Sequence, residues 1–148
     1  ISPNSQITFN GGSLGAWSSS FTTDRSYLLL GSGTFDVGAA QTLTQSTLST
    51  FSGSGQLQKQ GLGTLVLNGM NFQANGNALW IFNGMVRVSS DANIGDTATN
   101  GTVVFLGGGL QIAANMSSNR KLWPNANTTV SPAAAASRTR SGSRSSAM

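Results

Sequence analysis

The chain has 148 residues, which is enough for one domain with a hydrophobic core. It contains no Cys and no His, and its acids are four scattered Asp residues, so zinc binding, histidine-based catalysis and paired-carboxylate catalysis are poorly supported. Much of the net charge of +4 comes from Arg138, Arg140 and Arg144, so the sequence does not predict a basic nucleic-acid-binding face.

Short segments in which apolar and polar residues alternate predict strands, and Gly or Asn corners separate these segments. In a strand, every second side chain shares a face. The residues expected to face inward, in chain order, are Phe35, Val37, Leu57, Leu65, Leu67, Val86, Val88, Phe105, Leu110 and Ile112. Asn-Gly corners at 68–69 and 83–84 also fit an antiparallel meander, which stays open on this observation alone.

A long internal repeat favours stacked coils over the meander. Phe9 and Leu14 recur as Phe105 and Leu110, in each case 96 residues later, with a pair of Gly residues between them. Arg25 and Arg120 follow in the same order, 95 residues apart. A repeat made of many short strands is what a solenoid gives, because each coil needs its neighbours to bury its apolar face.

The composition divides the chain into two parts. Residues 1–130 carry the strand pattern, whereas residues 131–148 combine Ala, Ser and Arg and contain almost no core-forming residue. We therefore expect a β-helical segment over 1–130 and a disordered tail over 131–148.

One segment resembles a known family. Residues 52–69 are similar to the passenger-associated repeat of bacterial autotransporters, G-x-L-x-K-x-G-x-G-T-L-x-L-x-G. The matching residues, in order, are Gly55, Leu57, Lys59, Gly61, Gly63, Thr64, Leu65, Leu67 and Gly69. The sequence departs from the family pattern after Asn71, where residues 72–77 predict a local bulge.

The resemblance implies an all-β, right-handed parallel β-helix, or β-solenoid, in a passenger domain. It further implies type V secretion, in which a separate C-terminal outer-membrane β-barrel carries the passenger to the bacterial cell surface. The function that follows is a structural or adhesive stalk section without catalysis, cofactor or metal. Host-surface or glycan ligands are the candidate partners, and nucleic acid is not.

Two weak motifs have simpler interpretations. Residues 11–15 match the G-x-S-x-G nucleophile pattern, but a chain without His lacks the usual base, so a turn is expected. Residues 31–36 resemble a calcium-binding turn, but such sites need tandem copies, so a strand with Asp36 pointing outward is expected.

Two alternative functions remain open. Asp24 and Arg25 could stack with residues 119–121 and serve a β-helical polysaccharide lyase or hydrolase, but an exposed ion pair is the favoured interpretation. Trp80 is out of phase with its apolar neighbours, so it could point outward and contact a carbohydrate. Trp17, Trp123 and Tyr27 are the other aromatic residues considered for such a surface.

Overall fold

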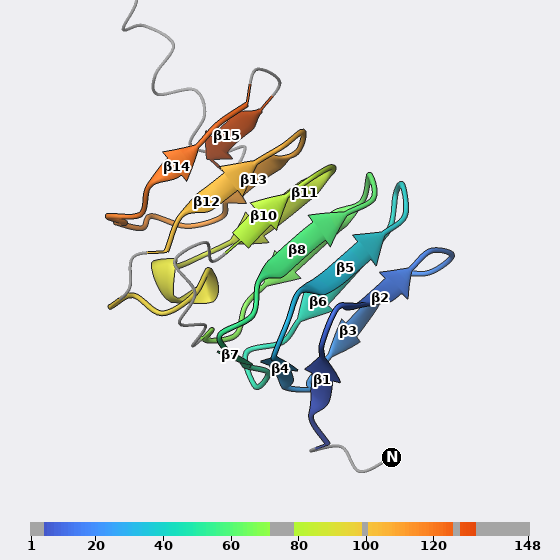
Figure 1. Cartoon of the computed structure of the whole chain (residues 1–148). Coiled ribbons are helices and arrows are strands. Elements are labelled where there is room, and N and C mark those ends of the chain that lie inside the picture. The colour runs from blue at the N-terminus through green and yellow to red at the C-terminus, as the bar shows by residue number, and fades with distance from the viewer. Residues whose placement is uncertain (1–4, 72–78, 99–100, 126–127, 133–148) are drawn as a thin grey trace, which may run out of the picture.

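The computed structural model of the chain describes residues 5–71, 79–98, 101–125 and 128–132. These residues form a stack of coils, each coil contributing one strand to each of two or three sheets (Figure 1). Sheet A contains β1 (Ile7–Phe9), β4 (Tyr27–Leu29) and β7 (Phe51–Gly53). Sheet B contains β2 (Gly12–Ala16), β5 (Gly33–Val37), β8 (Leu57–Gln60), β10 (Leu79–Ile81), β12 (Val103–Phe105) and β14 (Leu122–Trp123). Sheet C contains β3 (Phe21–Thr23), β6 (Thr42–Gln45), β9 (Thr64–Leu67), β11 (Met85–Val88), β13 (Gly109–Ile112) and β15 (Thr129–Pro132).

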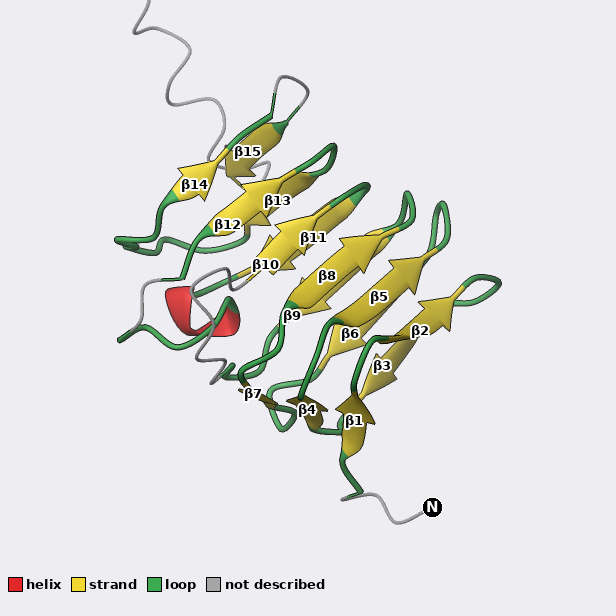
Figure 2. Ribbon diagram, viewed as in Figure 1, coloured by secondary structure: helices red, strands yellow, loops and turns green. Residues whose placement is uncertain are grey.

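Each strand pairs in parallel with the equivalent strand of the next coil (Figure 2). Paired residues are separated by 19 to 24 residues along the chain. The separation is 19 for Val103 and Leu122 and 24 for Leu79 and Val103. An antiparallel meander would pair consecutive strands through tight hairpins, which is not the observed connectivity. The structure therefore confirms the predicted parallel β-solenoid.

The repeat of 96 residues is not a structural repeat. Phe9 lies on β1 of sheet A, whereas Phe105 lies on β12 of sheet B. Leu14 and Leu110 likewise fall on sheets B and C. Both segments consist of a strand, a glycine corner and a second strand. In one coil this pattern forms the corner between sheets A and B, and in another it forms the corner between sheets B and C. The two segments therefore look equivalent in the sequence.

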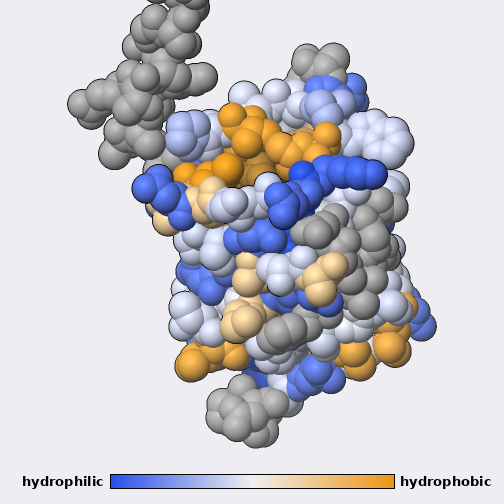
Figure 3. Space-filling view, turned by 90° about the vertical axis from the view of Figure 1, so that its left-hand side faces the viewer, coloured by the Kyte–Doolittle hydropathy of each residue, from blue (hydrophilic) through white to orange (hydrophobic). Residues whose placement is uncertain are grey.

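The inward-facing side chains form one continuous core. All the residues predicted to face inward are buried except Ile112, which is half-buried. Ile112 lies near the C-terminal end of the described stack, where fewer coils cover it, and Figure 3 shows hydrophobic surface gathered toward that end. Seven further apolar or aromatic side chains are fully buried without having been predicted: Tyr27, Leu29, Leu43, Phe51, Leu79, Ile81 and Val103.

Aromatic rings fill the first three coils. Tyr27 stacks on Phe51 with ring centroids 4.8 Å apart, and Phe35 packs edge-on against both rings. Phe9 lies against Tyr27 and Phe35 at 6.0 and 5.6 Å. These rings give the N-terminal coils a wide core between sheets A and B.

Among the described residues, β7 is the last strand of sheet A, and one isolated bridge joins Phe51 to Asn71. Between β11 and β12 the chain instead passes through a short 3-10 helix, η1 (Asp91–Asn93). The predicted bulge at 72–77 lies outside the described residues.

The end of the solenoid differs slightly from the prediction. β15 continues to Pro132, so Ser131 and Pro132 pair with Gln111 and Ile112 and belong to sheet C rather than to a tail starting at 131. Residues 133–148 lie outside the described part of the chain. Among the described residues, no helix has the length and apolar composition required to cross a membrane.

Candidate functional site

The nine residues of the predicted motif lie on β8, β9 and the corners around them. Leu57, Leu65 and Leu67 point into the core and are completely buried. At each of the four motif glycines, an added Cβ would overlap a backbone carbonyl of the preceding coil, so no larger residue fits there. These glycines are Gly55, Gly61, Gly63 and Gly69. Gly61 also has a φ of +74°, which disfavours other residues. The motif therefore keeps successive coils in close contact at the corners.

Lys59 lies inside the solenoid. Its side chain is fully buried on the same face of β8 as Leu57. The Nζ ammonium donates hydrogen bonds to the carbonyl oxygens of Gln60 at 2.6 Å and Gly61 at 2.7 Å. A third, to Asn83 O at 3.3 Å, reaches the corner of the next coil. The lysine thus joins two successive corners between sheets B and C and satisfies carbonyls that the turns leave unpaired.

Burial lowers the pKa of Lys59 to about 8, and the carboxylate of Asp36 opposes this shift. Asp36 lies on the outer face of β5, as predicted, and is half-buried. Lys59 remains mainly protonated near neutral pH, so its three hydrogen bonds are charge-assisted. These contacts assign Lys59 a structural role at the corner.

A second polar column runs through the interior near the corner between sheets C and A. Gln45, Asn71 and Asn93 occupy successive coils and are almost completely buried. The Oδ1 atom of Asn71 accepts hydrogen bonds from Gln45 Nε2 at 3.1 Å and from the backbone N–H of Phe51 at 3.2 Å. Its Nδ2 atom donates to the carbonyl of Asn93. Asn93 Nδ2 donates in turn to Gly69 O at 2.8 Å, which links the motif to η1.

Arg120 fastens η1 to the coil that follows it. Its buried guanidinium pairs through Nε with the Asp91 carboxylate at 2.8 Å and donates through Nη2 to Gly95 O at 2.7 Å. Ser118 Oγ donates to the same Asp91 oxygen at 2.6 Å. The sequence suggested a surface role for Arg120, but its side chain is a buried link between coils.

Asp24 and Arg25 do not join this cluster. Arg25 lies just before β4 of sheet A and donates to Ser5 Oγ, whereas Arg120 lies just before β14 of sheet B. The two segments belong to coils near opposite ends of the stack, so the patch considered as an alternative for them is not formed. In the described part of the chain, no group of three or more Asp, Glu, His or Cys residues could hold a metal ion.

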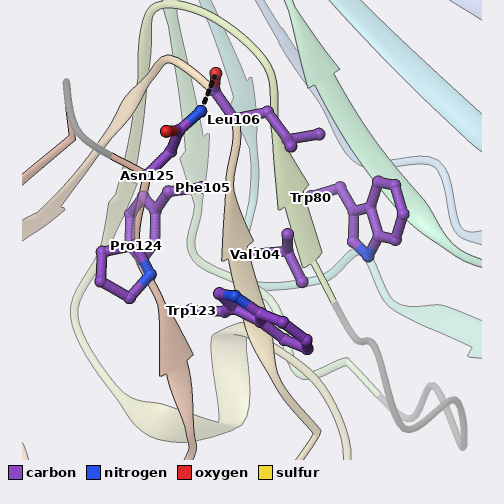
Figure 4. A pocket seen from close by; sticks show the side chains of 7 residues that line it. All are labelled: Trp80, Val104, Phe105, Leu106, Trp123, Pro124 and Asn125. Atoms are coloured by element: carbon purple, nitrogen blue, oxygen red, sulfur yellow. Dashed lines mark hydrogen bonds between the residues drawn. The ribbon is translucent and has the colours of Figure 1, made fainter.

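The aromatic residues considered for a ligand surface separate in the same way. Tyr27 is buried in the core, where its hydroxyl donates to Thr23 Oγ1 at 3.2 Å and where burial raises its pKa. Trp17 is exposed on the loop between β2 and β3. Trp80 and Trp123 lie together on the outer face of sheet B, where they line a shallow pocket of about 400 Å³ (Figure 4). Val104 lies between their strands, in register with both.

The G-x-S-x-G segment is a turn followed by a strand. Gly11 has a φ of +98° and ends the connection from β1, and residues 12–15 then form part of β2. The helix that a nucleophile elbow requires does not follow, so the segment has a structural role.

Comparison with known proteins gives one significant similarity. Over 101 residues the chain is 38% identical to "Adhesin BmaC autotransporter" of Brucella suis biovar 1 (strain 1330). The alignment covers 68% of the chain but only 3% of that protein, so the chain corresponds to a small part of its length. No family model matches the chain. No solved structure shows significant similarity to it.

The fold defines the class first: a parallel β-solenoid whose coils share a continuous core and whose corners are held by a buried lysine and close glycine contacts. Together with the similarity to an autotransporter adhesin, this fold places the chain in the family of autotransporter passenger domains. The passenger-associated repeat at 55–69 stays a prediction.

Proposed function

We propose that this chain is a non-catalytic, structural and adhesive section of the passenger of a type V secreted protein, exposed at the bacterial cell surface. In this proposal a C-terminal outer-membrane β-barrel translocator exports it. The observation that carries the proposal is that the described residues form a parallel solenoid and that the chain is 38% identical, over 101 residues, to an autotransporter adhesin.

The solenoid has the mechanical properties that a stalk requires. Each strand of sheets B and C between the terminal coils has parallel partners on both sides, so backbone hydrogen bonds run along the stack. The buried side chains form one cluster that runs from Phe9 in the first coil to Leu110 on β13. Such a section resists bending and offers proteases few unpaired segments, because each coil is held by both neighbours.

The distribution of polar groups supports a non-catalytic role. The ion pair between Asp91 and Arg120 is further hydrogen-bonded to Ser118 and to the backbone, and it holds coils together. A polysaccharide lyase or hydrolase would need acids and cations gathered on one outer face. Asp24 with Arg25 and Arg120 with Lys121 lie in coils far apart in the stack.

The proposal is tested by placing residues 1–148 between a secretory signal and an autotransporter β-barrel in a Gram-negative host. We expect antibody labelling of intact cells, resistance of the displayed chain to protease, and more attachment to cultured epithelial cells than with the barrel alone. A matched Leu65→Asp chain should be displayed in a protease-sensitive form. Retention inside the cell, or display without any gain in attachment, would contradict the proposal, as would turnover of polysaccharide substrates.

A further inference from the structure

We propose that the outer face of sheet B carries a binding site for an uncharged, extended saccharide chain lying along the solenoid axis, with Trp80 and Trp123 as its stacking residues. The inference deepens the proposed adhesive function, on which it rests, by assigning the class of ligand. It begins from the pocket that these two tryptophans share with Val104, Leu106 and Asn125.

The geometry follows from the strand register. Trp80, Val104 and Trp123 are direct partners on β10, β12 and β14. Trp80 and Val104 are the middle residues of their strands, between buried neighbours, and together with Trp123 they line the pocket on the outer face of sheet B. Neighbouring strands lie about 4.8 Å apart, so two positions separated by one strand are about 10 Å apart along the axis. That spacing is close to the length of a disaccharide unit in an extended pyranose chain. Alternate sugar rings could therefore stack on the two indoles above Val104.

The two tryptophans present different amounts of surface. Trp123 is 69% exposed, which leaves its ring accessible. Trp80 is half-buried, and its ring centroid lies 6.1 Å from that of Phe82. Its Nε1 atom is buried without a hydrogen-bond partner among the described residues, and the ring packs beside that of Phe82. The two indoles therefore form one stacking surface, in which Trp123 is the accessible ring and Trp80 is the packed ring.

The same row continues toward the N-terminus with polar, uncharged side chains. Gln58 is the partner of Trp80, Thr34 of Gln58, and Ser13 of Thr34. Thr34 Oγ1 donates to Gln58 Oε1 at 3.2 Å, and Gln58 Nε2 donates to Gln56 Oε1 at 2.8 Å. Amides and hydroxyls linked in this way can exchange hydrogen bonds with sugar hydroxyls without leaving a buried charge unpaired.

The chemistry of the row selects a neutral saccharide over other ligands. None of its six positions is charged, so it offers no cation for an acidic polysaccharide: Ser13, Thr34, Gln58, Trp80, Val104 and Trp123. A peptide that binds by strand addition needs unpaired backbone groups, but sheet B presents side chains on this face and pairs its backbone within the sheet.

The test uses the full chain, with cellohexaose and fully N-acetylated chitohexaose, both uncharged, as probes in isothermal titration calorimetry. We expect one of these extended β-linked hexamers to bind. Trp123→Ala should weaken binding roughly tenfold, the upper end of what one aromatic contact contributes. Trp17→Ala is the matched control, because Trp17 is 67% exposed but lies outside the row. It should leave the affinity unchanged. Trp80→Phe keeps a ring in the packed position and should weaken binding less than Trp123→Ala.

Binding of neither hexamer by the folded chain would overturn the proposal, and so would equal losses in the Trp17 and Trp123 variants. If a proline-rich peptide binds instead and the Trp123 variant loses it, the site belongs to a protein partner and the saccharide assignment is wrong. The proposed function fails separately: a chain that binds a hexamer but is not displayed or adhesive refutes the stalk role alone. Normal attachment by a chain that binds no saccharide refutes only the site.

Discussion

At the scale of single residues, Lys59 stands out because its buried ammonium donates three hydrogen bonds to corner carbonyls of two successive coils. Leu57 was expected to face inward, and a period of two places Lys59 on the same face. A lysine in the core is uncommon, because its charge must be desolvated. The alternation already contained this signal, but the carbonyls that accept its hydrogen bonds become visible only when successive corners are stacked.

The pH dependence of stability should report on Lys59. Its pKa is about 8 in the folded chain and 10.5 without burial, so between these values the unfolded chain binds the extra proton. Stability conferred by this group should therefore rise as pH increases from 8 to 10. Above pH 10 the raised pKa of Tyr27 acts in the opposite direction, since the folded chain then retains the tyrosine proton.

The measurement is the melting temperature of the wild-type chain minus that of Lys59→Met, taken at several pH values. The difference should increase between pH 8 and pH 10. A flat difference across this range would show that the lysine is solvated in the folded chain.

Leu65 tests the assignment of inward positions. It is fully buried on β9, whereas Leu62, three residues earlier, is 73% exposed at the corner. Leu65→Ala should lower the free energy of unfolding by about 2–5 kcal/mol, and Leu65→Asp should unfold the neighbouring coils because it buries a charge. Leu62→Asp should change stability by no more than about 0.5 kcal/mol. Similar melting temperatures for Leu65→Asp and Leu62→Asp would sink the core assignment.

At the scale of elements, the sequence predicted strands better than it predicted how sheet A ends. The alternating segments that contain Phe35, Leu65 and Val86 form strands with the expected inward faces. The replacement of sheet A after β7 by η1 and a polar column was not foreseen. Gln45, Asn71 and Asn93 look like ordinary corner residues in the sequence. Their partners lie one coil away, and local patterns do not contain that information.

Asn71→Ala should destabilise the chain near this column. It removes the acceptor of the buried Phe51 N–H and one acceptor of Gln45 Nε2. An unsatisfied buried group costs about 1–3 kcal/mol, so we expect a loss in that range or somewhat above it. Chemical denaturation provides the measurement, with Asn83→Ala as the control because the Asn83 side chain is exposed. If the two variants have equal free energies of unfolding, the hydrogen bonds of the Asn71 side chain do not stabilise the fold.

At the scale of the whole molecule, the family resemblance led to the right fold although the apparent repeat had the wrong phase. The motif at 55–69 marks one coil and its corners, and stacking that unit generates the solenoid. The segments around Phe9 and Phe105 repeat a corner pattern and belong to different sheets. The sequence singled out Trp80, but its proximity to Trp123 depends on a register between coils that only the structure supplies.

The rise per coil tests most directly whether the chain forms a stack of parallel coils. The chain has no cysteine, so spin labels can be attached at introduced cysteines on the outer face of sheet C. Thr22, Thr44, Val66, Arg87 and Gln111 occupy one row of parallel partners. Labels at positions 22 and 111 should be about 19 Å apart along the axis, because four strand spacings of about 4.8 Å separate them. Pairing position 22 with Ser131, one coil further, should add about 5 Å. Distances measured by pulsed electron paramagnetic resonance that increase by this step would confirm the stack of coils, and distances that do not increase from 111 to 131 would contradict it.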